Sequence, residues 1–133
     1  MTAVKQFLVV DDDRQNNFLT EMALKKSFEA AEVTVFMVPE LALEHIETQF
    51  QNTEDKKITI ILDINMPTMS GWEFVEKFNA LDKSLKKLFE IYMLSSSIDA
   101  ADINRAKGNP LILDFIEKPL NKMIVKKIFG ESI

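Results

Sequence analysis

The chain has 133 residues, with 16 basic and 21 acidic side chains, a formal net charge of −5, one histidine and no cysteine. This length suits a single domain over residues 1–133 with a sizeable core. The lack of cysteine excludes disulfides and thiolate metal sites, and the negative charge argues against broad nucleic-acid binding. No apolar run approaches the roughly 18 residues of a membrane span. The first residues lack the apolar region of a signal peptide, so we expect a cytoplasmic protein.

Strand-like and helix-like patterns alternate along the first half of the chain. Strands are predicted at residues 6–10 and 33–38, the second of them rich in β-branched residues. The helix between them, about 15–30, should turn one stripe inward, made of Leu19, Met22, Ala23 and Lys26. Pro39 suits the first position of the next helix. That helix has three apolar residues at helical spacing, namely Leu43, Ile46 and Phe50.

The second half continues the alternation, with strands predicted at residues 58–62, 88–94 and 111–117. Ser70 and Glu73 fit a capping box that opens a helix. Four residues of this helix should face inward: Phe74, Val75, Phe78 and Leu81. The alternation predicts an α/β fold, in which helices cover both faces of a five-stranded parallel sheet.

Three further segments complete the predicted order. Residues 83–87 read as a basic, exposed connector, and residues 99–107 as a short helix that stops at Gly108 and Pro110. A last helix, about 121–129, should turn Ile124, Val125 and Ile128 inward. His45 is expected to face solvent, and Trp72 to be a packing residue.

Polar side chains follow four of the predicted strands. Asp11 to Asp13 follow the first strand, Asp63 the third, Ser95 the fourth and Lys118 the fifth. If the strands are parallel, these residues lie at one edge of the sheet, where open α/β sheets bind ligands. Together they indicate a metal-assisted site that accepts a phosphoryl group.

Each acidic residue has two possible roles, one functional and one purely structural. Consecutive carboxylates repel one another, and a divalent cation with oxygen ligands, Mg²⁺ above all, removes that penalty. The alternative is that Asp12 or Asp13 merely caps the next helix, and we assign Asp13 mainly to capping or solvent. Asp63 can attack phosphorus and form an aspartyl phosphate. Its alternative is a strand end that starts a turn.

Ser95 and Lys118 can offer a hydroxyl and a positive charge to a phosphoryl group. Taken alone, each is more simply a loop serine or a surface lysine. Pro119 is relevant because a cis bond before it would direct Lys118 into the site. Phe115 alternates with Ile116 along the fifth strand, and the simplest interpretation of each residue is that it packs in the core.

Other phosphate chemistries fit poorly, because the chain has no glycine-rich phosphate loop and Asn65 stands where an aspartate-based phosphatase needs a second acid.

Four segments in this order resemble the receiver domain of two-component response regulators, in the stand-alone form of which the chemotaxis response regulator is the example. They are FLVVDD at residues 7–12, LDINMPTMSG at 62–71, MLSS at 93–96 and FIEKPL at 115–120. The resemblance implies a flavodoxin-like, doubly wound sheet of order 2-1-3-4-5 with five helices. Two details depart from the commonest pattern: Ser96 replaces a small residue, and the last helix is short.

The resemblance also implies residue roles. Asp63 would accept a phosphoryl group from a sensor histidine kinase or a histidine phosphotransfer protein. Mg²⁺ would be held by the side chains of Asp12 and Asp63, by the backbone carbonyl of Asn65, and by Asp11 through water. Ser95 and Lys118 would then bind the phosphoryl group, and Phe115 would turn inward as the switch.

The sequence is therefore compatible with three functions. The leading one is a phosphorylation-dependent switch that catalyses only its own phosphoryl transfer and dephosphorylation, and acts on an unknown downstream protein as a monomer or weak dimer. Direct output and a relay of phosphate both stay open. The alternatives are a pseudo-receiver that binds a partner constitutively, disfavoured by the intact set of five site residues, and a hydrolase of a small phosphate ester, disfavoured by Asn65.

Overall fold

The computed structural model describes residues 5–49, 57–96 and 99–129. Five strands form one parallel sheet of order β2-β1-β3-β4-β5. The strands are β1 (Gln6–Val10), β2 (Glu32–Phe36), β3 (Ile58–Asp63), β4 (Phe89–Ser95) and β5 (Ile112–Glu117). The predicted α/β class, parallel pairing and strand order are thus confirmed.

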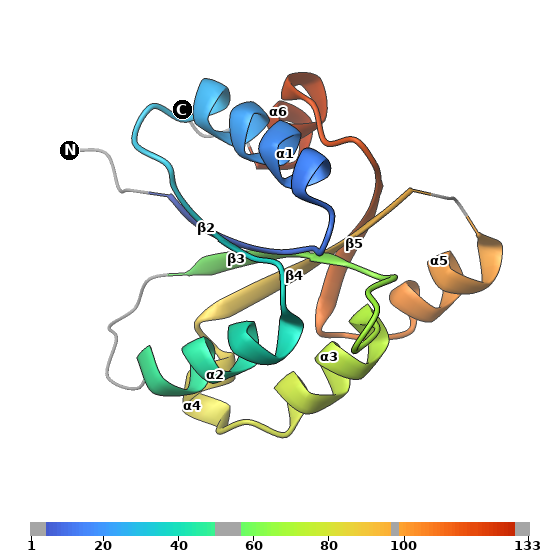
Figure 1. Ribbon diagram of the computed structural model, residues 1–133. Helices are drawn as coiled ribbons and strands as arrows, with labels where there is room; N and C mark the ends of the chain where they lie inside the picture. Colours follow the sequence, from blue (N-terminus) through green and yellow to red (C-terminus); the bar gives the residue numbers. More distant parts are fainter. Residues whose placement is uncertain (1–4, 50–56, 97–98, 130–133) are drawn as a thin grey trace.

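The described ranges contain six helices, one more than predicted. They are α1 (Arg14–Ser27), α2 (Pro39–Gln49), α3 (Gly71–Asn79), α4 (Lys83–Lys86), α5 (Ala100–Lys107) and α6 (Lys122–Phe129). Figure 1 shows α1 and α6 on one face of the sheet, with α2 and α3 on the other. None of the described helices has the length and apolar character needed to cross a membrane.

The two faces of the central strands bury separate apolar clusters. Along β1, Phe7 and Val9 pack into the cluster that includes Leu24 and Val125, under α1 and α6. Their neighbours Leu8 and Val10 pack into the other cluster, with residues of α2 and α3. A strand covered on both sides in this way reads as a continuous apolar run, which is why β1 and β3 were recognisable in the sequence.

The predicted inner stripe of α1 is confirmed at Ala23, which is buried, but is wrong at Leu19 and Lys26. Leu19 is 42% exposed and Lys26 is exposed as well, whereas Met22 is half-buried. The buried residues of α1 are Asn16, Asn17, Thr20, Ala23 and Leu24. The helix begins at Arg14 because Asp13 caps it, with its side chain accepting a hydrogen bond from the Asn16 backbone N–H. Its buried face therefore starts with polar residues, which an apolar pattern cannot reveal.

Two local predictions also need correction. Residues 83–87 are not a plain connector, because Asp82 caps the one-turn helix α4 and Leu85 is buried beneath it. His45 does not simply face solvent, since it is half-buried and its ring centre lies 5.0 Å from that of Phe36. In both cases packing against another part of the fold accounts for the difference: Leu85 joins the apolar cluster under α2 and α3, and His45 lies against Phe36 of β2.

The other helix predictions agree with the structure. Ser70 and Glu73 form the predicted capping box of α3, and the helix buries three of its four predicted inner residues, with Leu81 half-buried just beyond it. In α2 and α6, Ile46 and Val125 are buried, and Leu43, Ile124 and Ile128 are half-buried. Phe50 lies outside the described residues.

Helix α5 is held by few apolar contacts. Of its eight residues, all described, only Ala106 is buried. Trp72, at the start of α3, adds two polar contacts to this helix. Its indole Nε1 donates a hydrogen bond of 3.3 Å to Asp102 Oδ1, and the Arg105 guanidinium lies 4.5 Å from the ring centre. Trp72 is thus a packing residue, as predicted, and it ties α5 to α3.

Trp72→Leu should therefore loosen α5 more than the rest of the fold. The change removes a cation–π contact of about 0.5–1 kcal/mol and a hydrogen bond of about 0.5–1.5 kcal/mol. We expect amide hydrogen exchange in Ala100–Lys107 to accelerate about tenfold, with smaller changes in β1 and β3. Trp72→Phe, which keeps an aromatic face for Arg105, should have a smaller effect. A uniform acceleration across the sheet would contradict this account of α5.

Candidate functional site at the carboxyl edge of the sheet

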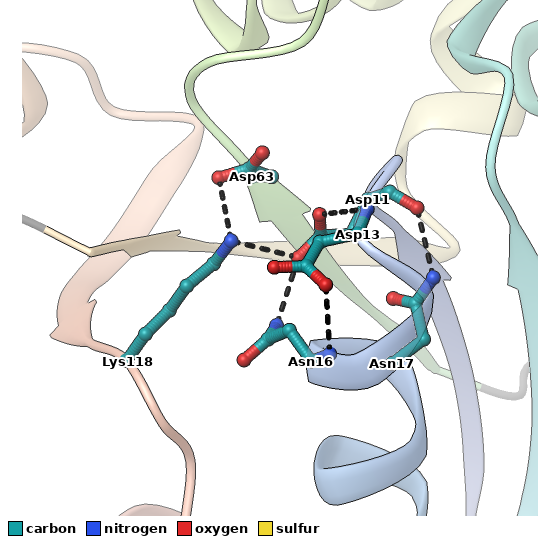
Figure 2. Close-up of polar contacts among 6 residues, drawn as sticks. All are labelled: Asp11, Asp13, Asn16, Asn17, Asp63 and Lys118. Carbon is teal, nitrogen blue, oxygen red and sulfur yellow. Dashed lines mark hydrogen bonds and ion pairs between the residues drawn. The ribbon is translucent and has the colours of Figure 1, made fainter.

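The carboxyl ends of β1, β3 and β5 bring two carboxylates and one ammonium together. Asp11 follows β1, Asp63 is the last residue of β3, and Lys118 follows β5. Lys118 Nζ lies 3.0 Å from Asp11 Oδ2 and 3.2 Å from Asp63 Oδ1. Figure 2 shows the lysine side chain reaching between the two acids. All three side chains are largely buried, so solvent screens these ion pairs less than it screens surface pairs.

Asp12 adds a third carboxylate to this group. One oxygen each from Asp11, Asp12 and Asp63 lie within 4.8 Å of one another. Three carboxylates beside one ammonium leave an excess of negative charge, and the half-buried Asp12 gives the cluster access to solvent. An oxygen-only donor set that keeps room for water fits Mg²⁺, which takes few protein carboxylates and retains several waters.

The first turn of α1 holds Asp11 in place. Asp11 Oδ1 accepts a hydrogen bond of 2.9 Å from the Asp13 backbone N–H, and Oδ2 accepts one of 2.8 Å from Asn16 Nδ2. The backbone carbonyl of Asp11 accepts a third, of 2.9 Å, from Asn17 Nδ2. The predicted capping role of Asp13 is confirmed, since its carboxylate accepts from the Asn16 N–H at 3.1 Å.

The sequence reasoning did not single out Asn16 or Asn17. Both are buried, with 6% and 5% of their surface exposed. The sequence offered only a weak indication of their role, namely two adjacent asparagines in the first turn of a helix, just after an acidic run. Asparagine is common near helix starts for capping alone. Only the folded geometry at the start of α1 shows that these two amides donate hydrogen bonds to Asp11.

The loop after Asp63 is closed tightly. The Gly71 N–H donates a hydrogen bond of 2.7 Å to the Ile64 carbonyl. A Cβ at Gly71 would lie 2.5 Å from the Asp63 carbonyl oxygen and 2.9 Å from Ile64 Cα. Glycine is therefore required here by close backbone approach, and this contact seats the start of α3 directly against Asp63.

The remaining predicted residues lie around this group. Ser95 is the last residue of β4, is buried, and accepts a backbone hydrogen bond of 2.7 Å from the Lys118 N–H. The Lys118–Pro119 peptide bond is cis. Asn65 is exposed in the loop two residues after Asp63. Phe115 is half-buried in β5 and lines a pocket between β5 and α5.

Burial and neighbouring charges change the pKa values of Asp63 and Lys118 for different reasons. The pKa of Asp63 is raised to about 6, first by burial and then by the neighbouring Asp11 carboxylate. Lys118 lowers this pKa in part, and Asp12 adds a smaller rise. For Lys118, burial opposes the charged form, but hydrogen bonding and attraction from Asp11 and Asp63 outweigh it and raise the pKa. The ammonium is thus retained at neutral pH, beside a carboxylate that ionises at unusually high pH.

This arrangement suits reaction with an electrophilic phosphorus. The Asp63 carboxylate can act as a nucleophile when ionised. Lys118, already at ion-pair distance from Asp63, can attract the oxygens of a group transferred there. A cation held by the acids would add to that attraction, and would also favour the ionised form of Asp63.

The raised pKa of Asp63 predicts a specific dependence of stability on pH. Between about pH 4 and 6 the folded chain binds more protons at Asp63 than the unfolded chain, so this group lowers stability as pH rises through that range. Asp63→Asn removes the effect. In the presence of a metal chelator, the variant should be more stable than the wild type by about 1–3 kcal/mol at pH 7.

Urea unfolding at several pH values measures this difference. The two stability curves should converge below about pH 3, where Asp63 is mostly protonated in the folded and unfolded states alike. Parallel curves from pH 4 to 7 would show that the environment of Asp63 does not penalise its charge.

Comparisons with known proteins identify the family. The family model for the response regulator receiver domain matches residues 7–129. No curated protein matches the chain. Among solved structures, the chain is similar to a response regulator receiver protein from Dyadobacter fermentans, with 29% identity and a TM-score of 0.81 over 97% of this chain and 100% of that one.

Two other structures support the same fold. A two-component response regulator from Cytophaga hutchinsonii is 23% identical, with a TM-score of 0.85 over 97% of this chain and 96% of that one. The chemotaxis response regulator CheY4 of Vibrio cholerae is 25% identical, with a TM-score of 0.72 over 94% of this chain and 95% of that one. Because the family model matches residues 7–129, from within β1 to the end of α6, this chain belongs to the response regulator receiver domain family.

Proposed function

We propose that this receiver domain accepts a phosphoryl group on Asp63 from a sensor histidine kinase or a histidine phosphotransfer protein, and that phosphorylation changes its protein–protein contacts. Receiver domains are signalling modules that interact with such donors, and the expected setting is the cytoplasm. The observation that carries the proposal is the position of Asp63. Its carboxylate ends a buried strand, 3.2 Å from the Lys118 ammonium and within the acidic cluster.

The proposed reaction transfers one phosphoryl group. A carboxylate oxygen of Asp63 forms a bond to phosphorus, the bond from phosphorus to the donor histidine nitrogen breaks, and its electron pair stays on the imidazole. Mg²⁺, held by the side chains of Asp12 and Asp63, the Asn65 carbonyl and, through water, Asp11, would neutralise the phosphoryl oxygens when bound. Lys118 and the hydroxyl of Ser95 would bind those oxygens.

The same contacts supply a switch. The backbone N–H of Lys118 bonds to the Ser95 carbonyl, so the ends of β4 and β5 are joined. A phosphoryl group that draws in both side chains therefore acts on both strand ends. Phe115, three residues before Lys118, lines the pocket against Ile103 and Ala106 of α5. An inward turn of Phe115 would change this face of the molecule.

The energy required is within reach of these contacts. To convert a switch from mostly off to mostly on takes about 5 kcal/mol of differential stabilisation. A hydrogen bond to a charged group contributes about 1.5–3 kcal/mol. New bonds from Ser95 and Lys118 to a phosphoryl group would supply about that amount, less the contact that Lys118 gives up at Asp11. The lightly held α5 is the element whose position we expect to respond.

Acetyl phosphate with Mg²⁺ tests the phosphoryl-accepting role by intact mass. The wild type should gain one acid-labile phosphoryl group, and Asp63→Asn should gain none. Asp13→Asn is the matched control, because asparagine also caps helices and Asp13 is assigned to capping. This control should be phosphorylated like the wild type.

The other possible results of this experiment would each favour a different function or a different acceptor residue. No gain in the wild type, with Mg²⁺ binding demonstrated, would favour a constitutively binding pseudo-receiver. Equal gain in Asp63→Asn would place the acceptor at another residue. Continued release of phosphate well beyond one group per chain would favour a hydrolase.

Beryllofluoride, a phosphoryl mimic, tests the switch separately. With Mg²⁺ it should alter amide exchange in Ala100–Lys107 and in β5 of the wild type, because Phe115 and α5 share one pocket. In Asp63→Asn it should have no effect. If the wild type binds the mimic and both segments exchange as before, phosphorylation does not act through this face.

A further inference from the structure

We propose that Asn16 is a positioning residue, which keeps the Asp11 carboxylate directed at the cation site when Lys118 moves to a phosphoryl group. The inference rests on the proposed function, because it concerns the cation and the phosphoryl group that this function requires. Asn16 touches neither of them in the arrangement we infer. It acts through Asp11.

Asn16 is itself fixed at both ends. Its backbone N–H donates to the capping carboxylate of Asp13 at 3.1 Å. Its side-chain Nδ2 donates to Asp11 Oδ2 at 2.8 Å, in a buried hydrogen bond. A short side chain held between a helix cap and its acceptor has little freedom to turn away. Figure 2 shows Asn16 projecting from the first turn of α1 toward Asp11.

The donors to the Asp11 carboxylate differ in what they do during the reaction. Oδ1 accepts from the Asp13 backbone N–H, whereas Oδ2 accepts from both Asn16 and Lys118. Lys118 also contacts Asp63, where the phosphoryl group is expected. When the ammonium follows that group, Oδ2 loses its charged donor. Asn16 is then the donor that the described residues still provide to this oxygen.

An amide suits this position for an electrostatic reason. A second lysine or arginine beneath Asp11 would hold the carboxylate equally well, but its positive charge would repel a divalent cation a few ångströms away. The neutral amide of Asn16 orients the carboxylate without that repulsion. Partners that orient metal-binding groups in this way typically affect metal affinity by about 10–100-fold.

Calorimetric titration with Mg²⁺ alone tests the role of Asn16. We expect the dissociation constant to rise about tenfold in Asn16→Ala and in Asn16→Leu. The leucine variant nearly preserves side-chain size, so a folded variant is available even if the alanine variant is unstable. Thr20→Ala is the matched control, because Thr20 is buried on the same face of α1, one turn further on. Its dissociation constant should stay within about twofold of the wild type.

A double-mutant cycle with Lys118→Ala tests the exchange of donors. If Asn16 and Lys118 share Asp11 Oδ2, Asn16→Ala should weaken Mg²⁺ binding at least about threefold more in the Lys118→Ala background than in the wild type. Equal effects in the two backgrounds would overturn the exchange.

The outcomes separate this inference from the proposed function. A wild type that does not bind Mg²⁺ would defeat the proposed function itself. A wild type that binds, with folded Asn16 variants that bind equally well, would overturn the role of Asn16 alone. An equal loss in Thr20→Ala would also overturn it, because the cause would then be general loosening of α1.

Discussion

The bridge formed by the Lys118 ammonium between Asp11 and Asp63 is the interaction on which the site depends. Two buried carboxylates from the ends of β1 and β3 repel each other, and each would lose its hydration without compensation. The ammonium provides that compensation. Under the proposed function, a cation beside the acids or a phosphoryl group on Asp63 would compete for these contacts, so the site would respond to the arrival of either.

The residues that form the acidic edge are held by several contacts, whereas the neighbouring helix α5 buries little of its surface. Asp63 is fixed by the close approach of Gly71, and Asp11 by the first turn of α1. In contrast, α5 buries only Ala106 among its described residues, with Ile103 half-buried, and Trp72 adds two further contacts. We therefore expect α5 to move at a lower energetic cost than the residues of the acidic edge. This division is what a signalling switch requires.

Much of this was accessible from the sequence. Apolar runs that end in polar residues located β1, β3, β4 and β5, and the capping box at Ser70 located the start of α3. Predictions failed where a contact between elements, or a polar contact, determines the local structure. Leu85 supports α4, and Phe36 covers His45. The buried face of α1 was misread because it begins with Asn16 and Asn17, polar side chains whose burial makes sense only beside Asp11.

The central claim is that Asp63 carries the phosphoryl group. Borohydride reduction of the phosphorylated chain, followed by peptide mass mapping, tests it directly, since reduction of an aspartyl phosphate leaves homoserine at the acceptor position. The account predicts homoserine at position 63 and unmodified aspartate at positions 11, 12 and 13. Homoserine at any of those three positions, with Asp63 unchanged, would contradict it.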